Sequence, residues 1–338
     1  MATYKGIKGV KVVTKASDPT ASEADGTVWY NSTSPTALKY AIQGAAAWAS
    51  GTNTSRSGTT DAQLSGTQTA ALYAGGYAPA PTLNRGETEK YDGTTWTEVA
   101  DLNTARYASW MGGTQTASVY AGGQITAPSA LSETWDGTSW TETNNMQNSR
   151  HNMGMAGTQT NGLAIGGLDT TPTGDCEDYN GTSWSTGTAI NTARYSAGSC
   201  GASSTSAIVA GGANNPPPAA YYNAISETWN GSTWTEGNNL NTARFALAGF
   251  GIVTAALVCA GYLPAGSPRD ANNTETYNGT SWAAAPTMGT ARYSPGGTGG
   301  PGGISSGLIA GGNGDSGLSQ AVEEWNDPVY TIKTVTVS

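Results

Sequence analysis

The stretch Glu133-Thr134-Trp135-Asp136-Gly137-Thr138-Ser139-Trp140 decides the fold of this chain, because the sequence keeps returning to it. The shared pattern is an acid, any residue, an aromatic residue, Asp or Asn, Gly, two hydroxyl residues and Trp. It recurs at 89–96, 177–184, 227–234 and 275–282, and residues 323–326 form a truncated sixth copy. The leading glutamates lie 44, 44, 50, 48 and 48 residues apart. A period of this size predicts a repeat architecture, in which each copy is one supersecondary unit.

Length and composition agree with a repeat. The 338 residues could hold two domains, but the repeat occupies most of them and favours one large array. The 47 glycines and 11 tryptophans, with only 2 phenylalanines and 12 % charged residues, favour short strands and tight turns over helices. No run of eighteen apolar residues is present, so we expect no membrane span. The first residues contain no apolar signal core, and we expect no signal peptide.

The net charge of −9 is unevenly distributed. Residues 1–15 contain four lysines and no acid, so the repeats are more acidic than the chain as a whole. Phosphate binding needs a basic surface, and the repeats are therefore not expected to bind nucleic acid. The basic segment is either a contact for an acidic partner or a solvated strand face; its lysines are Lys5, Lys8, Lys11 and Lys15.

Each unit follows one order, from Asn-Thr-Ala-Arg-aromatic through an apolar run and Gly-Gly to a variable loop and the glutamate block. The arginine recurs at Arg56, Arg106, Arg150, Arg194, Arg244 and Arg292. Five of these arginines are preceded, four positions earlier, by an apolar residue: Leu102, Met146, Ile190, Leu240 and Met288. The glycine pair is weakened to Ala260-Gly261 in the fifth copy, and the phrase Gly-Thr-Gln-Thr recurs at Gly66, Gly113 and Gly157. These landmarks define six units.

Each unit is predicted to contain four strands. In the second unit these are 107–111, 118–121, 133–135 and 139–141, with a turn over 112–115. Asp136-Gly137 predicts a two-residue hairpin turn. Trp140 is then available to pack between neighbouring sheets. Four-stranded sheets repeated radially form a β-propeller.

The order of apolar residue, arginine, Gly-Gly, Glu-aromatic-Asp and Trp resembles the kelch repeat over roughly residues 50–326. Kelch proteins fold as β-propellers, so the resemblance implies an all-β, six-bladed kelch-type β-propeller. We assign it to residues 38–327, with an N-terminal extension at 1–37 and a C-terminal strand or tail at 328–338. Leu38-Lys39-Tyr40 and Trp48 are interpreted as degraded aromatic and Trp positions. The repeat departs from the pattern at Gly261, which lacks its partner glycine, and at Asn326-Asp327-Pro328.

The sixth unit lacks its fourth strand, and this bears on how the ring closes. A strand near 46–50, carrying Trp48, is predicted to pair with the sheet that holds Trp325, because closure removes exposed sheet edges. The alternating strand 330–337 is the competitor for that place. A seven-bladed ring is a further alternative.

The sequence offers little for catalysis. Its single histidine, His151, stands where other units have Tyr or Phe, and we interpret it as structural. The cysteines Cys176, Cys200 and Cys259 lack metal-ligand spacing and are expected to be buried thiols. The Asp-Gly and Asn-Gly pairs lack the further oxygen ligands of a calcium loop. We therefore predict no catalytic residue, no cofactor and no metal site.

The repeated arginines and glutamates could form a ring of acid–base groups or could link the blades. Because both occur in every unit, we predict the structural role. The glutamates are Glu89, Glu133, Glu177, Glu227, Glu275 and Glu323.

The loops between the second and third strands vary most, and such insertions often form the binding surface of a repeat protein. They cover about 77–88, 124–132, 168–176, 213–226, 262–274 and 313–322. We predict that they gather on one face and bind a ligand or partner, with simply solvated loops as the alternative. Tyrosine supplies contact area at low entropic cost; the candidate residues are Tyr77, Tyr221, Tyr222, Tyr262 and Asp270.

The segment Asp18-Pro19…Gly26-Thr27-Val28-Trp29-Tyr30-Asn31…Leu38-Lys39-Tyr40 resembles a leader of tail-fibre and other virion proteins of tailed phages, particularly marine cyanobacterial ones. The resemblance implies a virion structural or adhesion protein, such as a tail fibre or a decoration protein, at the particle surface. Residues 1–37 and 328–338 would contact other virion proteins, and the loop face would bind a host-surface glycan or protein. The sequence does not decide whether the chain forms a homo-oligomer.

Two other functions remain as alternatives. One is a cellular kelch-type interaction scaffold. The other is a glycan-processing propeller enzyme, for which the candidate loop acids are Asp169, Asp175, Asp270 and Asp315.

Overall fold

The computed structural model describes residues 12–19, 28–33, 37–79, 83–215, 222–264, 270–299, 303–315, 317–327 and 330–335. The all-β prediction is confirmed, because these residues form strands and no helix. None of them forms a helix long and apolar enough to cross a membrane. The chain divides into a repeat domain, Trp48–Asn326, and a terminal unit made of Met1–Ala47 and Asp327–Ser338.

The described residues of the repeat domain form six four-stranded sheets, called the first to sixth sheets in chain order. The first three sheets are β5 (Gln63–Thr67), β6 (Ala70–Ala74), β7 (Thr88–Tyr91) and β8 (Trp96–Val99); β9 (Trp110–Thr114), β10 (Ala117–Ala121), β11 (Ser132–Trp135) and β12 (Trp140–Thr143); and β13 (Gly154–Thr158), β14 (Asn161–Leu168), β15 (Pro172–Tyr179) and β16 (Trp184–Thr186). The others are β17 (Gly198–Ser203), β18 (Ser206–Ala210), β19 (Ser226–Trp229) and β20 (Trp234–Glu236); β21 (Ala248–Ile252), β22 (Ala255–Cys259), β23 (Thr274–Tyr277) and β24 (Trp282–Ala285); and β25 (Gly296–Gly299), β26 (Ser306–Ala310), β29 (Val322–Asn326) and β4 (Ala47–Ser50). A small hairpin, β27 (Asn313–Gly314) with β28 (Gly317–Leu318), lies in the last variable loop.

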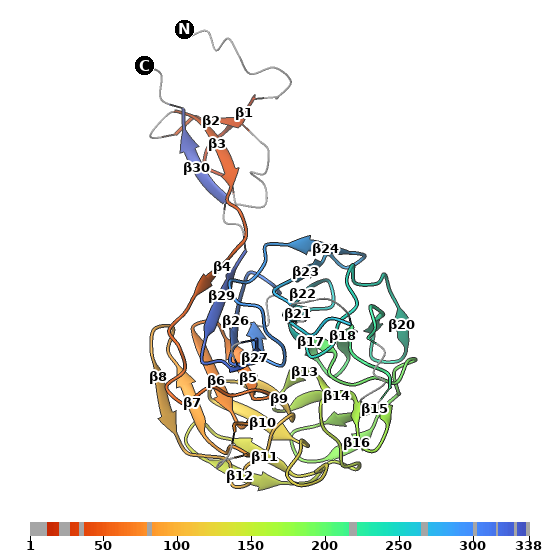
Figure 1. The fold of residues 1–338 in the computed structure, drawn as a ribbon. Helices are drawn as coiled ribbons and strands as arrows, with labels where there is room; N and C mark the ends of the chain where they lie inside the picture. The colour runs from red at the N-terminus through yellow and green to blue at the C-terminus, as the bar shows by residue number, and fades with distance from the viewer. Residues whose placement is uncertain are drawn as a thin grey trace. The chain divides into compact units, whose positions relative to one another are not determined.

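The six sheets are arranged around a common centre, as Figure 1 shows. Their first strands contact each other in order from β5 through β9, β13, β17 and β21 to β25, and β25 contacts β5. The second strands, such as β10, are almost wholly buried, as their apolar runs predict. The array is therefore propeller-like.

Two local predictions for the second sheet were wrong. The first strand begins at Trp110 rather than Tyr107, because Ala108 adopts a left-handed conformation (φ 54°) that interrupts it. The hairpin loop has four residues rather than two, because Trp135 pairs with Trp140. Asp136 sets this loop: its carboxylate accepts hydrogen bonds from the backbone N–H groups of Thr138 and Ser139, both at 2.8 Å.

The core lies between consecutive sheets. One cluster joins Leu72 of the first sheet to Tyr120 and Trp140 of the second, and Leu102 belongs to the same cluster. The Trp140 indole donates a hydrogen bond to Thr88 of the first sheet at 3.1 Å, so the repeat tryptophan connects neighbouring sheets. Another cluster joins Leu308 of the sixth sheet to the first sheet. The five apolar residues that precede the arginines are all buried.

The recurring glutamines also connect sheets. The side-chain amide of Gln115 donates to the Tyr91 carbonyl of the first sheet at 2.6 Å, and Gln159 donates to Trp135 of the second at 2.8 Å. Gln68, in the first sheet, donates to the carbonyl of Trp325 in the sixth sheet at 2.9 Å. The first and sixth sheets are therefore joined by the same bond as internal neighbours.

β4 occupies the outer position of the sixth sheet, next to β29. The rings of Trp48 and Trp325 lie 5.5 Å apart, close to the 5.3 Å between Trp135 and Trp140. The Trp48 indole donates to Thr274 of the fifth sheet at 2.9 Å, which is the bond that Trp140 makes to Thr88. The predicted pairing of the strand near 46–50 with the sheet of Trp325 is therefore observed.

Each of the six arginines pairs with its glutamate inside one unit. The shortest N–O distances are 3.6 Å for Arg56–Glu89, 2.5 Å for Arg106–Glu133, 2.9 Å for Arg150–Glu177, 2.7 Å for Arg194–Glu227, 2.6 Å for Arg244–Glu275 and 2.6 Å for Arg292–Glu323. These pairs are buried. The glutamate also accepts backbone N–H bonds from the segment before the arginine, as Glu133 does from Asn103 at 2.7 Å. One carboxylate thus holds both the cation and the connecting backbone.

The first unit departs from this pattern. The carbonyl of Arg106 accepts a hydrogen bond from Gly76, but the matching bond from Gly312 goes to Thr59 at 2.8 Å. Thr59 therefore holds the arginine position of the first unit, and Arg56 lies three residues earlier. Its guanidinium reaches Glu89 only at 3.6 Å and lies over the Tyr73 ring, 3.9 Å from the centroid.

A cycle of backbone hydrogen bonds joins the six units at the centre. Each unit contributes one residue with φ between 50° and 59°: Asp61, Ala108, Asn152, Ser196, Ala246 and Ser294. Each N–H donates to the carbonyl of the corresponding residue in the preceding sheet, with N–O distances from 2.7 to 3.1 Å. Asp61 of the first sheet donates to Ser294 of the sixth, so the cycle has no free end.

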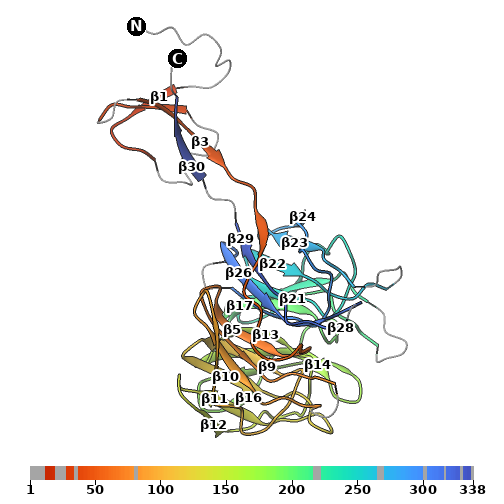
Figure 2. The same cartoon turned by 60° about the vertical axis from the view of Figure 1, so that its left-hand side comes forward.

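The terminal unit is one four-stranded sheet built from both ends of the chain. Its order is β1 (Val12–Lys15), β2 (Val28–Asn31), β3 (Ala37–Gln43) and β30 (Tyr330–Thr334), and Figure 2 shows β1, β3 and β30 together. β1 and β2 are parallel, whereas β2–β3 and β3–β30 are antiparallel. Asp18 accepts bonds from Trp29 (3.2 Å), Asn31 (2.8 Å) and Lys39 (2.7 Å). The motif residues of the leader therefore form one network.

This sheet corrects one prediction from the sequence and decides between two others. Leu38, Lys39 and Tyr40 lie in β3 and pair with β2 and β30, so they are not degraded repeat positions. The strand at 330–334 pairs with β3 and does not take the open place in the sixth sheet. Lys5, Lys8 and Lys11 lie outside the described residues.

Substitution of Glu133 tests the buried pairs. Glu133→Gln leaves the fully buried Arg106 without its counter-charge and should lower the free energy of unfolding by about 3–5 kcal/mol. Glu142→Gln is the control, because Glu142 lies directly opposite Glu133 on β12 but is exposed. Denaturant unfolding of both variants measures the effect, and equal small losses would contradict it.

Ala260 tests the left-handed positions. It has φ 62°, whereas five units place glycine there, with φ from 58° to 69° at Gly75, Gly122, Gly166, Gly211 and Gly311. Ala260→Gly relieves a left-handed strain of about 1–2 kcal/mol. The free energy of unfolding should therefore fall by at least about 1 kcal/mol less in Ala260→Gly than in Ala256→Gly. Ala256 is equally buried in the same sheet but has no positive φ. Equal losses in denaturant unfolding would show that φ is not the cause.

Candidate functional site

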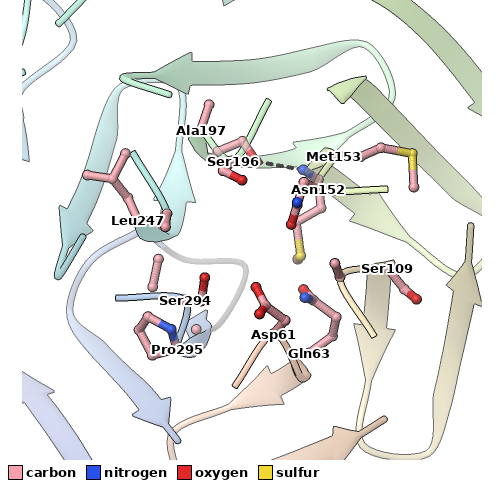
Figure 3. Close-up of a pocket in the computed structure, with 17 residues that line it drawn as sticks. Asp61, Gln63, Ser109, Asn152, Met153, Ser196, Ala197, Leu247, Ser294 and Pro295 are labelled. Atoms are coloured by element: carbon pink, nitrogen blue, oxygen red, sulfur yellow. Dashed lines mark hydrogen bonds between the residues drawn. The ribbon is translucent and has the colours of Figure 1, made fainter. Parts of the chain in front are cut away.

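The hydrogen-bond cycle surrounds an opening at the centre of the repeat domain. The opening is small, with a cavity volume of about 70 Å³, and its lining contains Asp61, Gln63, Asn152, Ser196 and Ser294. Figure 3 shows polar side chains from several sheets directed toward the middle of this opening. The backbone groups of the cycle are already bonded to each other, so side chains determine what the opening can bind.

Asp61 is the only charged residue among those that line the opening. Thr60 donates a hydrogen bond to its carboxylate at 3.2 Å. Burial raises the pKa of Asp61, and hydrogen bonds from Ser294 and Thr60 oppose that rise only in part. The described residues give Asp61 no ion pair. The other five positions of the cycle carry Ala, Asn or Ser, so this carboxylate breaks the symmetry of the repeat.

Aromatic side chains lie over five of the six sheets at this end of the repeat domain. The residue before each left-handed residue forms a β-bridge with the start of a variable loop, as in Phe245–Tyr262 and Tyr107–Gln124. The Phe245 ring stacks on Tyr222 at 4.7 Å and contacts Tyr262 at 5.7 Å. Tyr262 in turn contacts Tyr293 at 5.2 Å. We call Tyr195, Tyr222, Phe245, Tyr262 and Tyr293 the aromatic arc; it runs over the fourth to sixth sheets.

A second aromatic pair lies across the first and second sheets. Tyr77 and Tyr107 have ring centroids 5.1 Å apart. Burial raises the pKa of Tyr107, and the Asp61 charge adds to the effect. Burial, then Asp270 and then Asp61 likewise raise the pKa of Tyr293. Tyrosines from the second and sixth sheets therefore lie within electrostatic reach of Asp61.

Four of the five predicted binding residues lie at this end of the domain. Tyr77, Tyr222 and Tyr262 are half-buried and belong to the aromatic groups above. Asp270 is buried and forms a bridge with Tyr262. Burial raises the pKa of Asp270, and the neighbouring charge of Asp315 adds to this. Tyr221 lies outside the described residues.

The loop acids are only partly brought together. Asp270 and Asp315 are neighbours, as stated above, whereas Asp175 lies on β15, where Asn148 donates to it at 3.5 Å. Asp169 is in the short turn between β14 and β15. The predicted loop 168–176 was wrong in extent, because these two strands continue to Leu168 and from Pro172 and leave only three residues between them.

The three cysteines and the single histidine are buried, as the sequence predicts for the thiols. Desolvation raises the pKa of Cys176, Cys200 and Cys259 to about 12, so these thiols remain protonated. His151 is buried, forms the same kind of bridge as Tyr107, and its pKa is lowered by burial. Within the described residues, no three His, Cys, Asp or Glu side chains gather as metal ligands.

Sequence reasoning missed Asp61 and the aromatic residues that follow the arginines. Tyr107, Tyr195, Phe245 and Tyr293 were noted only as the place that His151 fills. In the sequence, these aromatic residues alternate with the tyrosines of the variable loops, and this pattern could have pointed to them. Only the β-bridges of the structure bring the two sets side by side. Asp61 could have been found as the one acid at its repeat position, but the displaced Arg56 concealed that alignment.

No protein-family model matches this chain, and no curated protein matches its sequence. The kelch resemblance therefore rests on the repeat landmarks themselves.

The environment of Asp61 predicts a pH-dependent stability difference. A folded pKa above the unfolded value means that the folded state holds more protons between the two, so stability falls as pH rises through that window. Asp61→Asn removes this loss and should be more stable than the wild type at about pH 7, with the difference vanishing near pH 3. Thermal unfolding across pH measures it.

Asp92→Asn is the matched control. Hydrogen bonds, first from the Thr95 backbone, lower the pKa of Asp92, so this substitution should give no gain at neutral pH. A gain in both variants would point to the overall negative charge rather than to the site of Asp61.

Proposed function

We propose that this chain is a virion structural or adhesion protein whose six-bladed, kelch-type β-propeller binds a host-surface glycan or protein through its loop face. The observation that carries the proposal is the collection of half-buried aromatic side chains around a polar opening on that face. Aromatic rings with polar edges provide large contact area and few rotatable bonds, which suits recognition. The terminal unit would contact other virion proteins.

Two bonds between the first and sixth sheets and the position of one strand support a closed ring of six blades. Gln68 donates to Trp325, Asp61 donates to Ser294, and Trp48 completes the sixth sheet from the other end of the repeat domain. Radial closure leaves each blade with only short, protected sheet edges. The glycine pairs, buried arginines and Glu-aromatic blocks occupy equivalent places in the sheets, which supports the kelch type.

The state of the reactive groups supports binding rather than catalysis. The thiols are buried and protonated, and the repeated Arg–Glu pairs are engaged with each other and with backbone groups. Their internal position leaves them unable to reach a ligand at the loop face. The loop face offers stacking surfaces and hydrogen-bonding groups instead.

The terminal unit supports an attachment role for the two ends of the chain. Its sheet leaves Val12 and Tyr30 exposed at 47 % and 41 %, and the register places both on one face. Exposed apolar side chains gathered on one face are typical of contact surfaces. The Asp18 network holds the leader residues together independently of the repeats.

A crossed experiment tests the two halves of the proposal. Phe245→Ala should weaken binding of the purified protein to host cell envelopes about tenfold, because it removes the centre of the aromatic arc. It should leave incorporation into phage particles unchanged. Tyr30→Ala should lower incorporation and leave envelope binding unchanged.

Each variant is the control for the other, and thermal unfolding checks that both remain folded. Envelope binding that Phe245→Ala does not change would remove the loop face as the binding surface. Absence of the wild-type protein from particles would remove the virion setting and leave the cellular scaffold as the better reading.

A further inference from the structure

Asp61 carries a cost that the architecture does not require. The cycle uses only the backbone of this residue, and Ala, Ser and Asn serve equally in the other units. Asn152 has the same φ of 54° and offers the same polar shape without a charge. A partly desolvated carboxylate without an opposing cation is unfavourable. The left-handed conformation at position 61 therefore does not explain why this residue is an aspartate.

The surroundings of Asp61 suit a cation that enters from the loop face. Figure 3 shows its carboxylate directed into the opening, with Gln63, Asn152 and Ser294 around the same space. Tyr107 and Tyr293 lie within electrostatic reach of it. The faces of aromatic rings attract cations, and hydroxyl and amide groups can bond to the polar atoms beside such a charge.

We propose that the mouth of the central opening binds a protonated amine carried on a sugar ring, with the ammonium entering the opening and pairing with Asp61. This inference rests on the proposed loop-face function and names its ligand class. The sugar ring lies at the mouth of the opening, where the flanking aromatic rings offer apolar surface, and Asn152, Ser196 and Ser294 are the polar groups that line the opening beside the ammonium. No covalent step is involved.

The carboxylate also sets which glycans are excluded. Sugars that carry carboxylates or sulfates would bring like charge to Asp61, and an acetylated amine would leave Asp61 without a counter-charge. Asp270 and Asp315 add negative charge on the same face. Arg269, beside Asp270 in the sequence, lies outside the described residues and is tested separately below.

The test compares a glucosamine tetramer with an N-acetylglucosamine tetramer by titration calorimetry of the full chain at about pH 6, where the amine is protonated. We expect the glucosamine tetramer to bind at least about tenfold more tightly, because a charge-assisted hydrogen bond is lost on acetylation. Asp61→Asn should abolish that preference, whereas Asp92→Asn and Arg269→Ala should keep it.

Several outcomes would overturn the inference. These are equal binding of the two tetramers, a preference that survives Asp61→Asn, binding of neither tetramer, and tighter binding of a lysine tetrapeptide than of the glucosamine tetramer. If Asp61 acts in folding alone, Asp61→Asn would change the unfolding temperature of the protein without changing the preference for the glucosamine tetramer. If the preference fails while Phe245→Ala still weakens envelope binding, only the ligand class is wrong and the loop-face function stands.

Discussion

Six residues in a left-handed conformation, bonded to each other through their backbones, set the arrangement of the whole repeat domain. Each N–H donates to the preceding unit, and each carbonyl accepts from the following one. Moving one unit would break two of these bonds in a place where few other partners are available. The conformation is unfavourable for Ala and Ser, so packing between the sheets must maintain it. The apolar clusters that join consecutive sheets provide that packing.

The buried ion pairs follow from this backbone constraint. In five units the arginine has the same place relative to the left-handed residue, and the N–O distance is 2.9 Å or less. In the first unit Thr59 holds that place, yet Arg56 still extends to Glu89 at 3.6 Å. The backbone bond from Gly312 is retained at Thr59 while the side-chain pair lengthens. The backbone cycle and its bonds from the glycines are therefore kept in every unit, whereas the length of the ion pair varies.

The sequence predicts features that each unit repeats with the same residue type. The glutamate block, the buried second strand and the role of Trp48 could be predicted because an aromatic, acidic or β-branched residue recurs at one spacing. The left-handed position could not, because Asp61, Ala108, Asn152 and Ser196 share no chemistry and only their backbones are equivalent. The terminal sheet could not be predicted either, since β3 pairs with β30 across almost the whole chain.

The candidate site follows the same division between repeated and unrepeated features. Repeated positions are used for architecture. Arginine pairs with glutamate in all six units, glutamine bonds to a neighbouring carbonyl in three, and tryptophan bonds to a neighbouring hydroxyl in three. The side chains of the left-handed residues make no such bond common to all units, so they can vary without cost to the ring. A ligand at the centre would meet four kinds of side chain on six equivalent backbones, and only Asp61 among them carries a charge. Function can therefore change by substitution at the centre and in the variable loops, while the bonds between sheets hold the same frame.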